Sequence, residues 1–213
     1  MSKKVVIIDY HLGNLFSVQQ ACNHLGADAK ISSDKNELLA ADYAILPGVG
    51  AFGDAMETLH ELDLVNPIHD FIQQGKPFMG VCLGLQLLFS ESEEFGNHKG
   101  LNVIEGVTRR FPAKNQDGGL LKVPQIEWNQ VNTYNGNNWK NSPLQKCNDG
   151  DYMYFVHSYY VIPENTKYIL STTTYGGLTY CSSVANGNIF ACQFHPERSG
   201  EHGLDIYRSF LNI

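Results

Sequence analysis

Along the first half of the chain, short apolar runs alternate with longer stretches in which apolar residues recur at helical spacing. The short runs are predicted strands, and the wholly apolar ones are typical of strands buried on both faces of a sheet; they occupy residues 5–8, 28–32, 43–46 and 78–81. Helices are predicted after them, over residues 13–25, 34–41, 66–75 and 83–90. Repeated units of this kind indicate a parallel sheet with helices on both faces.

Residues that favour helix starts or ends flank two of the predicted helices. Ser33 or Asp34 can accept hydrogen bonds from the first free N–H groups of the second helix. Asn66 followed by Pro67 is the preferred order at a helix start, a cap and then proline at the first helical position. Gly75 then closes that helix.

The second half of the chain changes to short strands with little helix between them. These strands are predicted at residues 102–111, 122–131, 152–156, 167–174, 179–185 and 188–194. The Asn- and Gly-rich stretch at residues 132–141 is predicted to be a surface loop, and residues 203–211 a last helix. We find no internal repeat and no long linker, so residues 1–213 are predicted to form one α/β domain with a mixed sheet.

Composition narrows the class of protein. Hydrophobic residues at 43% and charged residues at 17% indicate a globular chain, and a net charge of −7 disfavours a nucleic-acid partner. No segment approaches the roughly 20 apolar residues of a membrane helix, and the apolar run near the start is too short for a signal peptide. Five cysteines without a CxxC pair argue against a disulfide framework and structural zinc. We therefore expect a cytoplasmic protein with no membrane association and no metal.

The strongest chemical motif is the run GVCLGLQ at residues 80–86, where a buried strand turns into a helix. G-x-C-x-G at such a junction is the cysteine form of the nucleophile elbow, in which flanking glycines let strand and helix pack closely. Cys82 would lie at a helix N-terminus, which favours the thiolate. A buried cysteine acting as a small apolar residue is the better interpretation for Cys22, Cys181 and Cys192.

A second motif, QFHPE at residues 193–197, follows a predicted strand directly. A histidine at the carboxyl end of a strand lies at the rim where open α/β sheets place their sites. Glu197, two residues on, can turn back to orient the imidazole of His195. The pair supplies a base and its orienter, the remaining parts of a nucleophile–base–acid arrangement.

The third motif is PGVG at residues 47–50, also at a strand end. Acyl transfer needs two donors on the developing oxyanion, each worth roughly 2.7–4 kcal/mol. The N–H of Leu83, the residue after the nucleophile, is the natural first donor. A backbone N–H of Val49 or Gly50 is predicted to be the second, while a phosphate-binding loop is a weak interpretation without GK[ST] or GxGxxG.

Together the three motifs resemble the class I (triad) glutamine amidotransferases, and in detail the glutaminase subunits of imidazole glycerol phosphate synthases. The finer resemblance rests on four features: DY at residues 9–10 followed by GNL at 13–15, and the segments PGVGAF, YFVHSYY and FHPERSG at 47–52, 154–160 and 194–200. It spans nearly the whole chain and is weakest around residues 132–151. It implies a three-layer fold whose mixed, mostly parallel sheet has helices on both faces.

The resemblance also implies roles. Cys82 attacks the amide carbon of L-glutamine, His195 shuttles protons and Glu197 orients His195; the thioester is then hydrolysed to glutamate. The amino-acid end of glutamine would be held by Gly50, Gln86, Ser158 and Tyr159. No cofactor is implied. The ammonia would pass to a separate (β/α)₈-barrel cyclase subunit that makes imidazole glycerol phosphate and aminoimidazole carboxamide ribotide in histidine biosynthesis.

The same resemblance indicates which residues face that partner: Asn14, Pro124, Gln125, Glu127, Trp128, Asn129, Tyr154 and Arg198. Two of them depart from the family, which usually has histidine and glycine where Gln125 and Glu127 stand. His11 replaces a usual glycine. These departures either bear on the choice of partner or reflect drift at a tolerant interface, and they do not bear on glutamine hydrolysis.

Other functions are open at this point. A paralogous glutaminase that feeds ammonia to another synthase, such as a surface-glycan sugar amidotransferase, would share the same site. A cysteine peptidase of similar fold would share the elbow and the histidine, but PGVG and Gln86 favour glutamine. A catalytically dead regulatory protein would be expected to lack Cys82, His195 or Glu197, and all three are present.

Overall fold

The computed structural model describes residues 2–136 and 138–212 of the 213-residue chain. The helices, with two short 3₁₀ turns, are α1 (Leu15–His24), α2 (Lys35–Ala40), α3 (Phe52–Glu61), α4 (Val65–Gln73), α5 (Leu83–Leu87), η1 (Thr166–Tyr168), η2 (Pro196–Arg198) and α6 (Gly200–Phe210). The strands are β1 (Lys4–Ile8), β2 (Asp28–Ser32), β3 (Tyr43–Gly48), β4 (Phe78–Cys82), β5 (Phe89–Ser92), β6 (His98–Lys99), β7 (Ile104–Arg110), β8 (Gln125–Thr133), β9 (Asp151–His157), β10 (Tyr159–Pro163), β11 (Ile169–Tyr175), β12 (Leu178–Asn186) and β13 (Ile189–Cys192).

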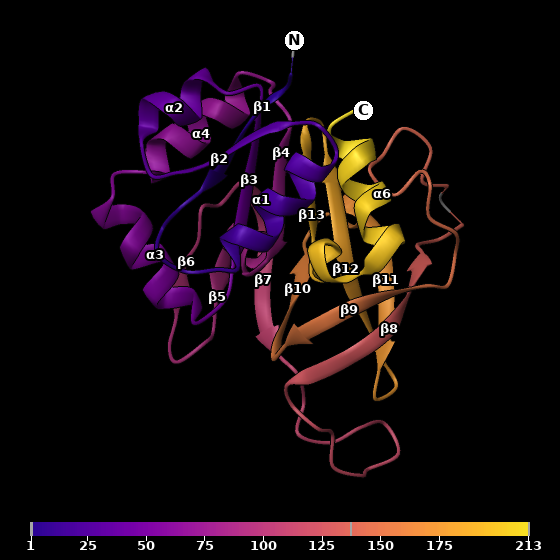
Figure 1. Cartoon of the computed structure of the whole chain (residues 1–213). Helices are drawn as coiled ribbons and strands as arrows, with labels where there is room; N and C mark the ends of the chain where they lie inside the picture. The colour runs from indigo at the N-terminus through magenta and orange to yellow at the C-terminus, as the bar shows by residue number, and fades with distance from the viewer. Residues whose placement is uncertain (1, 137, 213) are drawn as a thin grey trace.

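All of these strands belong to one sheet, whose main path has the order β2-β1-β3-β4-β13-β12-β10-β7-β5-β6. The run β2-β1-β3-β4-β13 is parallel throughout, and the later strands extend it with mainly antiparallel pairs. The prediction of a mixed, mostly parallel sheet between two helical layers is confirmed (Figure 1). The parallel run places the carboxyl ends of β3, β4 and β13 side by side, where the three sequence motifs begin.

The alternation of side chains along β1 separates two hydrophobic cores. Val6 and Ile8 pack with residues of α2, α3 and α4, while Val5 and Ile7 pack with residues of α1 and α6. Because successive side chains of a strand point to opposite faces, a wholly apolar strand needs a helical layer on each side. The apolar run at residues 5–8 therefore has both of its faces buried.

The strands β8 and β9 form a two-stranded antiparallel ribbon that crosses below the end of the main sheet (Figure 1). The ribbon joins the sheet where β8 pairs with β11 at Thr133 and Asn132. Its side chains alternate between an inner and an outer face. On the outer face Ile126, Trp128 and Tyr152 are about half exposed, at 51%, 51% and 52%.

Several sequence predictions of element position were wrong. The helix predicted over 83–90 ends at Leu87, because residues from Phe89 leave it to pair with β7 as strand β5. Helix α4 begins before the predicted Asn66–Pro67 start, with Leu64 at the cap position. The cap predicted for α2, by contrast, is confirmed for one of its two candidates: Asp34 accepts from the N–H groups of Asn36 and Glu37.

Three further elements were absent from the sequence prediction: α3, β6 and β10. The loop predicted at 132–141 begins later, because β8 continues to Thr133, and residue 137 of that stretch lies outside the described residues. Within the described ranges, no helix combines the length and hydrophobicity needed to cross a membrane.

Candidate active site

Cys82 lies at the last position of β4 in an unusual backbone conformation. Its φ is 56° and its ψ −108°, and α5 starts at the next residue. A non-glycine residue in such a region costs roughly 1–3 kcal/mol and persists only where the surrounding structure enforces it. Such strain concentrates at functional sites, and here the sharp turn places a 5% exposed thiol at a helix start.

The two glycines of the elbow have no room for a side chain. A Cβ at Gly80 would lie 2.8 Å from the carbonyl oxygen of Gly84, and a Cβ at Gly84 would overlap the carbonyl of Leu46. The strand and the helix therefore pack backbone to backbone. This confirms the reason given for the glycines in the G-x-C-x-G motif.

His195 and Glu197 form a buried pair just beyond β13, which ends at Cys192. His195 Nδ1 lies 2.8 Å from Glu197 Oε1, and the side chains are 5% and 2% exposed. The backbone N–H of His195 donates to the carbonyl of Tyr154, and its carbonyl accepts from the hydroxyl of Ser199. These contacts and the turn at Pro196 fix the imidazole, so the base–orienter geometry expected from the motif is present.

The charge state of His195 depends on its neighbours. Burial opposes the imidazolium, but the negative charge of a Cys82 thiolate and the Glu197 carboxylate together raise the pKa of His195 to about 10. Among the described residues, the Nε2 of His195 is buried without a hydrogen-bond partner. The protonated ring can therefore give its Nε2 proton to a leaving group, and the neutral ring can take a proton back from the sulfur or from water.

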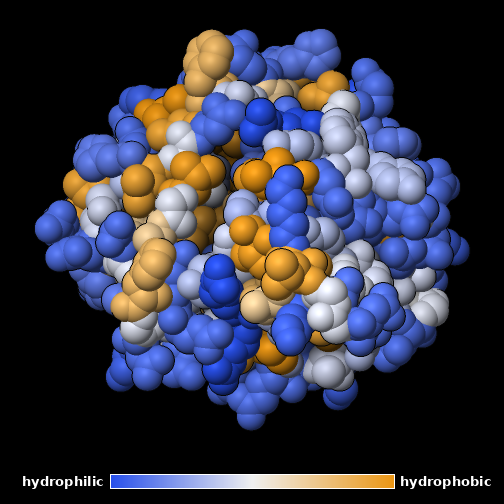
Figure 2. Space-filling model, turned by 90° about the horizontal axis from the view of Figure 1, so that it is seen from below, coloured by the Kyte–Doolittle hydropathy of each residue, from blue (hydrophilic) through white to orange (hydrophobic). Residues whose placement is uncertain are grey.

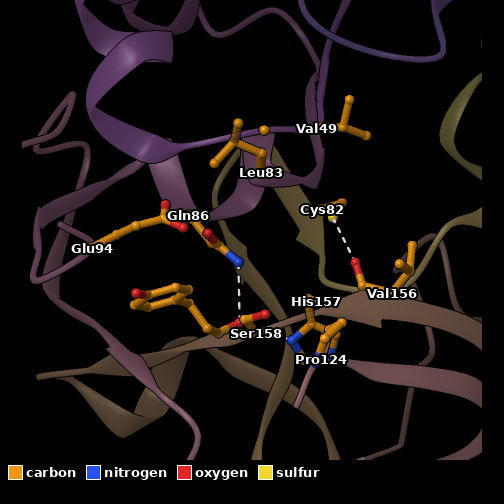
Figure 3. A pocket seen from close by; sticks show the side chains of 11 residues that line it. Val49, Cys82, Leu83, Gln86, Glu94, Pro124, Val156, His157 and Ser158 are labelled. Atoms are coloured by element: carbon orange, nitrogen blue, oxygen red, sulfur yellow. Dashed lines mark hydrogen bonds between the residues drawn. The ribbon is translucent and has the colours of Figure 1, made fainter.

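A pocket of about 260 Å³ opens beside the sulfur of Cys82. It is lined by Val49, Gly50, Cys82, Leu83, Gln86, Glu94, Pro124, Val156, His157, Ser158 and Tyr159. Figure 3 shows Val49 and Leu83 on one side of it, with His157, Ser158 and Pro124 across from them. Every residue predicted to serve the oxyanion or to hold the substrate therefore lies at one pocket.

A hydrogen-bond network holds the floor of this pocket. Gln86 Nε2 donates to the carbonyl of Tyr159 and to Gln193 Oε1, both at 3.1 Å. Gln193 Nε2 in turn lies 3.6 Å from Cys82 Sγ. Because both amide protons of Gln86 are engaged, its carbonyl oxygen is the atom that can receive a donor from a bound molecule. Gln193 stands in the QFHPE motif, but nothing in the sequence marked its contact with the sulfur.

The PGVG loop is fixed at its beginning and turns sharply at its end. The buried hydroxyl of Tyr10 donates to the carbonyl of Pro47 at 2.8 Å, and a Cβ at Gly48 would overlap that hydroxyl. Gly50 has a φ of 104°, which favours glycine, and Val49 is 42% exposed at the mouth of the pocket. Leu83, the other predicted oxyanion donor, begins α5.

Glu94 is a pocket residue that was not predicted from the sequence. Its carboxylate accepts from the backbone N–H of Phe52 at 2.7 Å, at the start of α3. Partial burial, helped by the charge of Asp54, raises its pKa. No local motif marks this residue, because β5 and α3 that bring it to the pocket were themselves missed.

Five of the eight predicted partner-facing residues lie on the ribbon, and they divide between its two faces. Trp128 and Tyr154 pack edge to face on the outer side, with ring centroids 6.1 Å apart, and Arg198 stacks 4.8 Å above the Tyr154 ring. Viewed from below, apolar side chains interrupt the otherwise polar surface (Figure 2). Asn14 and Pro124 are at least partly exposed, as is Asn129.

The prediction that Gln125 faces the partner at the surface was wrong. It is 0% exposed on the inner side of the ribbon, directly opposite His157 in the β8–β9 register. Glu127 shares this inner side but is exposed, and it accepts from Gln125 and Asn129. The sequence departure at Gln125 therefore lies in the interior and not on a contact surface.

Sequence comparisons place the whole chain among known proteins. The family model "Glutamine amidotransferase class-I" matches residues 6–213. The chain is 46% identical to the imidazole glycerol phosphate synthase subunit HisH of Syntrophotalea carbinolica, over 97% of this chain and 98% of that protein. It is 44% identical to the HisH subunit of Geobacter sulfurreducens, over 97% of each chain.

Solved structures show the same fold at lower identity. Thermotoga maritima PurLQS matches with a TM-score of 0.75 at 19% identity, over 100% of this chain and 99% of that chain. The glutaminase domain of Trypanosoma brucei CTPS matches with a TM-score of 0.62 at 17% identity, over 99% and 94%. At these identities the structures support the fold alone. The family match over nearly the full length, with HisH relatives above 40% identity, shows that this chain belongs to the class-I glutamine amidotransferases.

Proposed function

We propose that the chain is the glutaminase subunit of an imidazole glycerol phosphate synthase. It hydrolyses glutamine to glutamate and supplies the ammonia to a cyclase partner in histidine biosynthesis. The observation that carries the chemistry is the buried His195–Glu197 pair, 2.8 Å between Nδ1 and Oε1, beside the strained Cys82 elbow. The near-full-length HisH relatives support the pathway.

The proposed reaction begins with attack of the Cys82 sulfur on the amide carbon of glutamine. A bond forms between sulfur and carbon, and the carbonyl oxygen becomes an oxyanion that receives the N–H groups of Leu83 and of Val49 or Gly50. The C–N bond then breaks, and the leaving nitrogen takes a proton from His195. Ammonia departs and a thioester remains.

The second half of the reaction returns the enzyme to its starting state. Water attacks the thioester carbon as His195 accepts one of its protons, and the same N–H groups receive the second oxyanion. The carbon–sulfur bond breaks, glutamate leaves, and Cys82 regains its thiolate. Glu197 holds the imidazole in one orientation throughout and stabilises its cationic form.

The pocket suits the amino-acid end of glutamine. The carboxylate of Glu94 and the carbonyl oxygen of Gln86 would receive the substrate ammonium group. Ser158, Tyr159 and Gly50 line the same pocket and would hold the rest of that end. This assignment leaves the side-chain amide of glutamine to reach Cys82.

The ammonia is proposed to pass to a (β/α)₈-barrel cyclase docked on the face that carries the pocket mouth. The outer ribbon residues Trp128 and Tyr154, with Arg198 over the latter ring, provide aromatic and cationic contacts of the kind enriched at interfaces. Asn14, Pro124 and Asn129 would lie around them. We propose a cytoplasmic location for the complex, because the reaction needs a free thiol.

The test is a coupled assay with the cyclase encoded in the same genome. The mixture should form imidazole glycerol phosphate from glutamine, and the Cys82→Ala variant should fail with glutamine yet leave the cyclase active with added ammonium salt. The ammonium control separates loss of glutaminase activity from loss of the cyclase reaction. Glutamate release without any cyclase product would overturn the proposed pathway and favour a different synthase as the ammonia acceptor.

A further inference from the structure

A chain of buried polar side chains runs beneath the ribbon from an exposed carboxylate to the substrate pocket. Gln125 Nε2 donates to Glu127 Oε1 at 3.3 Å, and the Tyr180 hydroxyl lies 3.0 Å from Gln125 Oε1. His157 Nε2 lies 3.2 Å from the same hydroxyl. Gln125, Tyr180 and His157 are 0%, 3% and 6% exposed, so water cannot readily replace these partners.

The inner end of this chain meets the network that shapes the pocket. His157 Nδ1 lies 2.8 Å from the carbonyl oxygen of Tyr159. That oxygen also accepts from Gln86 Nε2 at 3.1 Å, and all three residues line the pocket. The position of the His157 ring therefore bears directly on the Tyr159 carbonyl and, through it, on Gln86.

The protonation of the chain can be derived from its partners. Burial, helped by the nearby charge of His195 and opposed by the bond to Tyr159, lowers the pKa of His157 to about 4. The neutral ring has one proton, and the Tyr159 carbonyl can only accept, so the proton is on Nδ1. His157 Nε2 can then only accept, and the Tyr180 hydroxyl 3.2 Å away is the donor within its reach.

Tyr180 has one proton for two acceptors. Burial raises the pKa of Tyr180 well above its ordinary value, so the hydroxyl stays protonated. His157 Nε2 and Gln125 Oε1 both lie within reach of this single donor. Gln125 cannot offer its amide protons instead without turning its oxygen toward the Glu127 carboxylate. The amide of Gln125 thus competes with His157 for the hydroxyl.

We propose that Tyr180 is a positioning residue for glutamine binding. Its hydroxyl donates to His157 and so fixes the ring that holds the Tyr159 carbonyl and, through it, Gln86. Gln125 weakens this effect, because its amide oxygen accepts the same proton. The inference rests on the proposed function, because it assigns this pocket to glutamine. It gives the departure at Gln125 a role inside the chain's own fold. A shift of the ribbon that moved Gln125 would change how firmly His157 is held.

The test measures glutamine affinity by calorimetry in a Cys82→Ser background, which prevents turnover. Tyr180→Phe keeps the ring and removes the donor, and should weaken binding roughly fivefold, the weight of one ordinary hydrogen bond. Gln125→Met keeps a similar volume and removes the competing acceptor, and should tighten binding. Tyr160→Phe is the matched control, because its ring packs 5.8 Å from Tyr180 but lies outside the polar chain.

A second readout does not depend on glutamine. The ¹⁵N shifts of His157 report which ring nitrogen is protonated and whether the other accepts a hydrogen bond. Tyr180→Phe should move the Nε2 signal toward that of an unbonded nitrogen, and Gln125→Met should move it the opposite way. Equal loss of affinity in both variants, or unchanged Nε2 shifts, would overturn the proposal. Absence of glutamine binding by the parent protein would instead count against the proposed function. The NMR result would still decide whether the Tyr180 hydroxyl holds His157 in competition with Gln125.

Discussion

The Nδ1 atom of His195 lies 2.8 Å from the Oε1 atom of Glu197, and both side chains are almost completely buried. Burial disfavours an isolated charge, so this pair is stable only because opposite charges face each other. A negative charge on Cys82, at the end of the neighbouring strand, is the largest influence that raises the pKa of the imidazole, and Glu197 raises it as well. The arrangement brings together two separated parts of the chain: Cys82 at the end of β4, and His195 with Glu197 after the neighbouring strand β13.

The first prediction concerns the pKa of His195, which lies near 10 against an ordinary value of 6.5. The thiolate is the largest raising influence, so Cys82→Ala should lower the pKa more than Glu197→Gln, although both lower it. Titration of the His195 ring by ¹⁵N NMR measures this order. An unchanged pKa in Cys82→Ala would contradict the thiolate–imidazolium pair.

The same shift has a consequence for stability. Because the folded-state pKa of His195 exceeds the unfolded value of 6.5, its contribution is complete below that pH and disappears as pH rises through about 10. The free energy of unfolding should therefore fall across this alkaline window in the parent protein. The fall should be smaller in Cys82→Ala, as measured by urea unfolding at a series of pH values.

The second prediction concerns the elbow. Gly84→Ala places a methyl group against the carbonyl of Leu46, where only backbone could move. We expect a loss of about 3 kcal/mol in unfolding free energy, the upper end for overpacking, together with loss of glutamate release. Gly119→Ala is the control, because its added carbon meets only the flexible side chain of Asn115. Equal stability of the two variants would contradict the close backbone packing.

The third prediction concerns control by the partner. The PGVG loop is anchored at Pro47 by Tyr10, whereas Gly50 at φ 104° leaves the peptide beside Val49 able to rotate. We expect the isolated chain to hydrolyse glutamine slowly and the cognate partner with acceptor substrate to raise the rate about a hundredfold, the effect of one oxyanion donor. Steady-state glutamate release with and without the partner measures this. High activity of the isolated chain, unchanged by any partner, would exclude the gating.

Much of the parallel sheet could be predicted from the sequence. A short, wholly apolar run such as residues 5–8 buries all of its side chains as a strand with a helical layer on each face. Helix α3 was missed although Phe52, Ala55, Met56 and Leu59 bury at helical spacing, because the adjoining glycines suggested a loop. The strand β10 was missed because it follows β9 after the single residue Ser158. Both patterns are present in the sequence, but the adjoining glycines and the short connection outweighed them in the prediction.

Some residues of the candidate site could likewise be predicted from the sequence, and others could not. Cys82 and His195 could be found because strand ends and short motifs mark them locally. The inward position of Gln125 and the role of Gln193 could not, since they depend on the register of strands far apart in the chain. A one-residue shift in that register would have exposed Gln125 instead.

Catalysis is proposed to depend on Cys82 as the nucleophile and on His195 and Glu197 as its base and orienter. The most direct measurement combines glutamate release in the assembled complex with mass mapping after a glutamine-mimicking alkylator. We expect modification of Cys82 alone, no release by Cys82→Ser, and a strong loss in Glu197→Gln with the fold intact. First labelling of Cys181 or Cys192 with Cys82 untouched, or nearly full activity of Glu197→Gln, would contradict these roles.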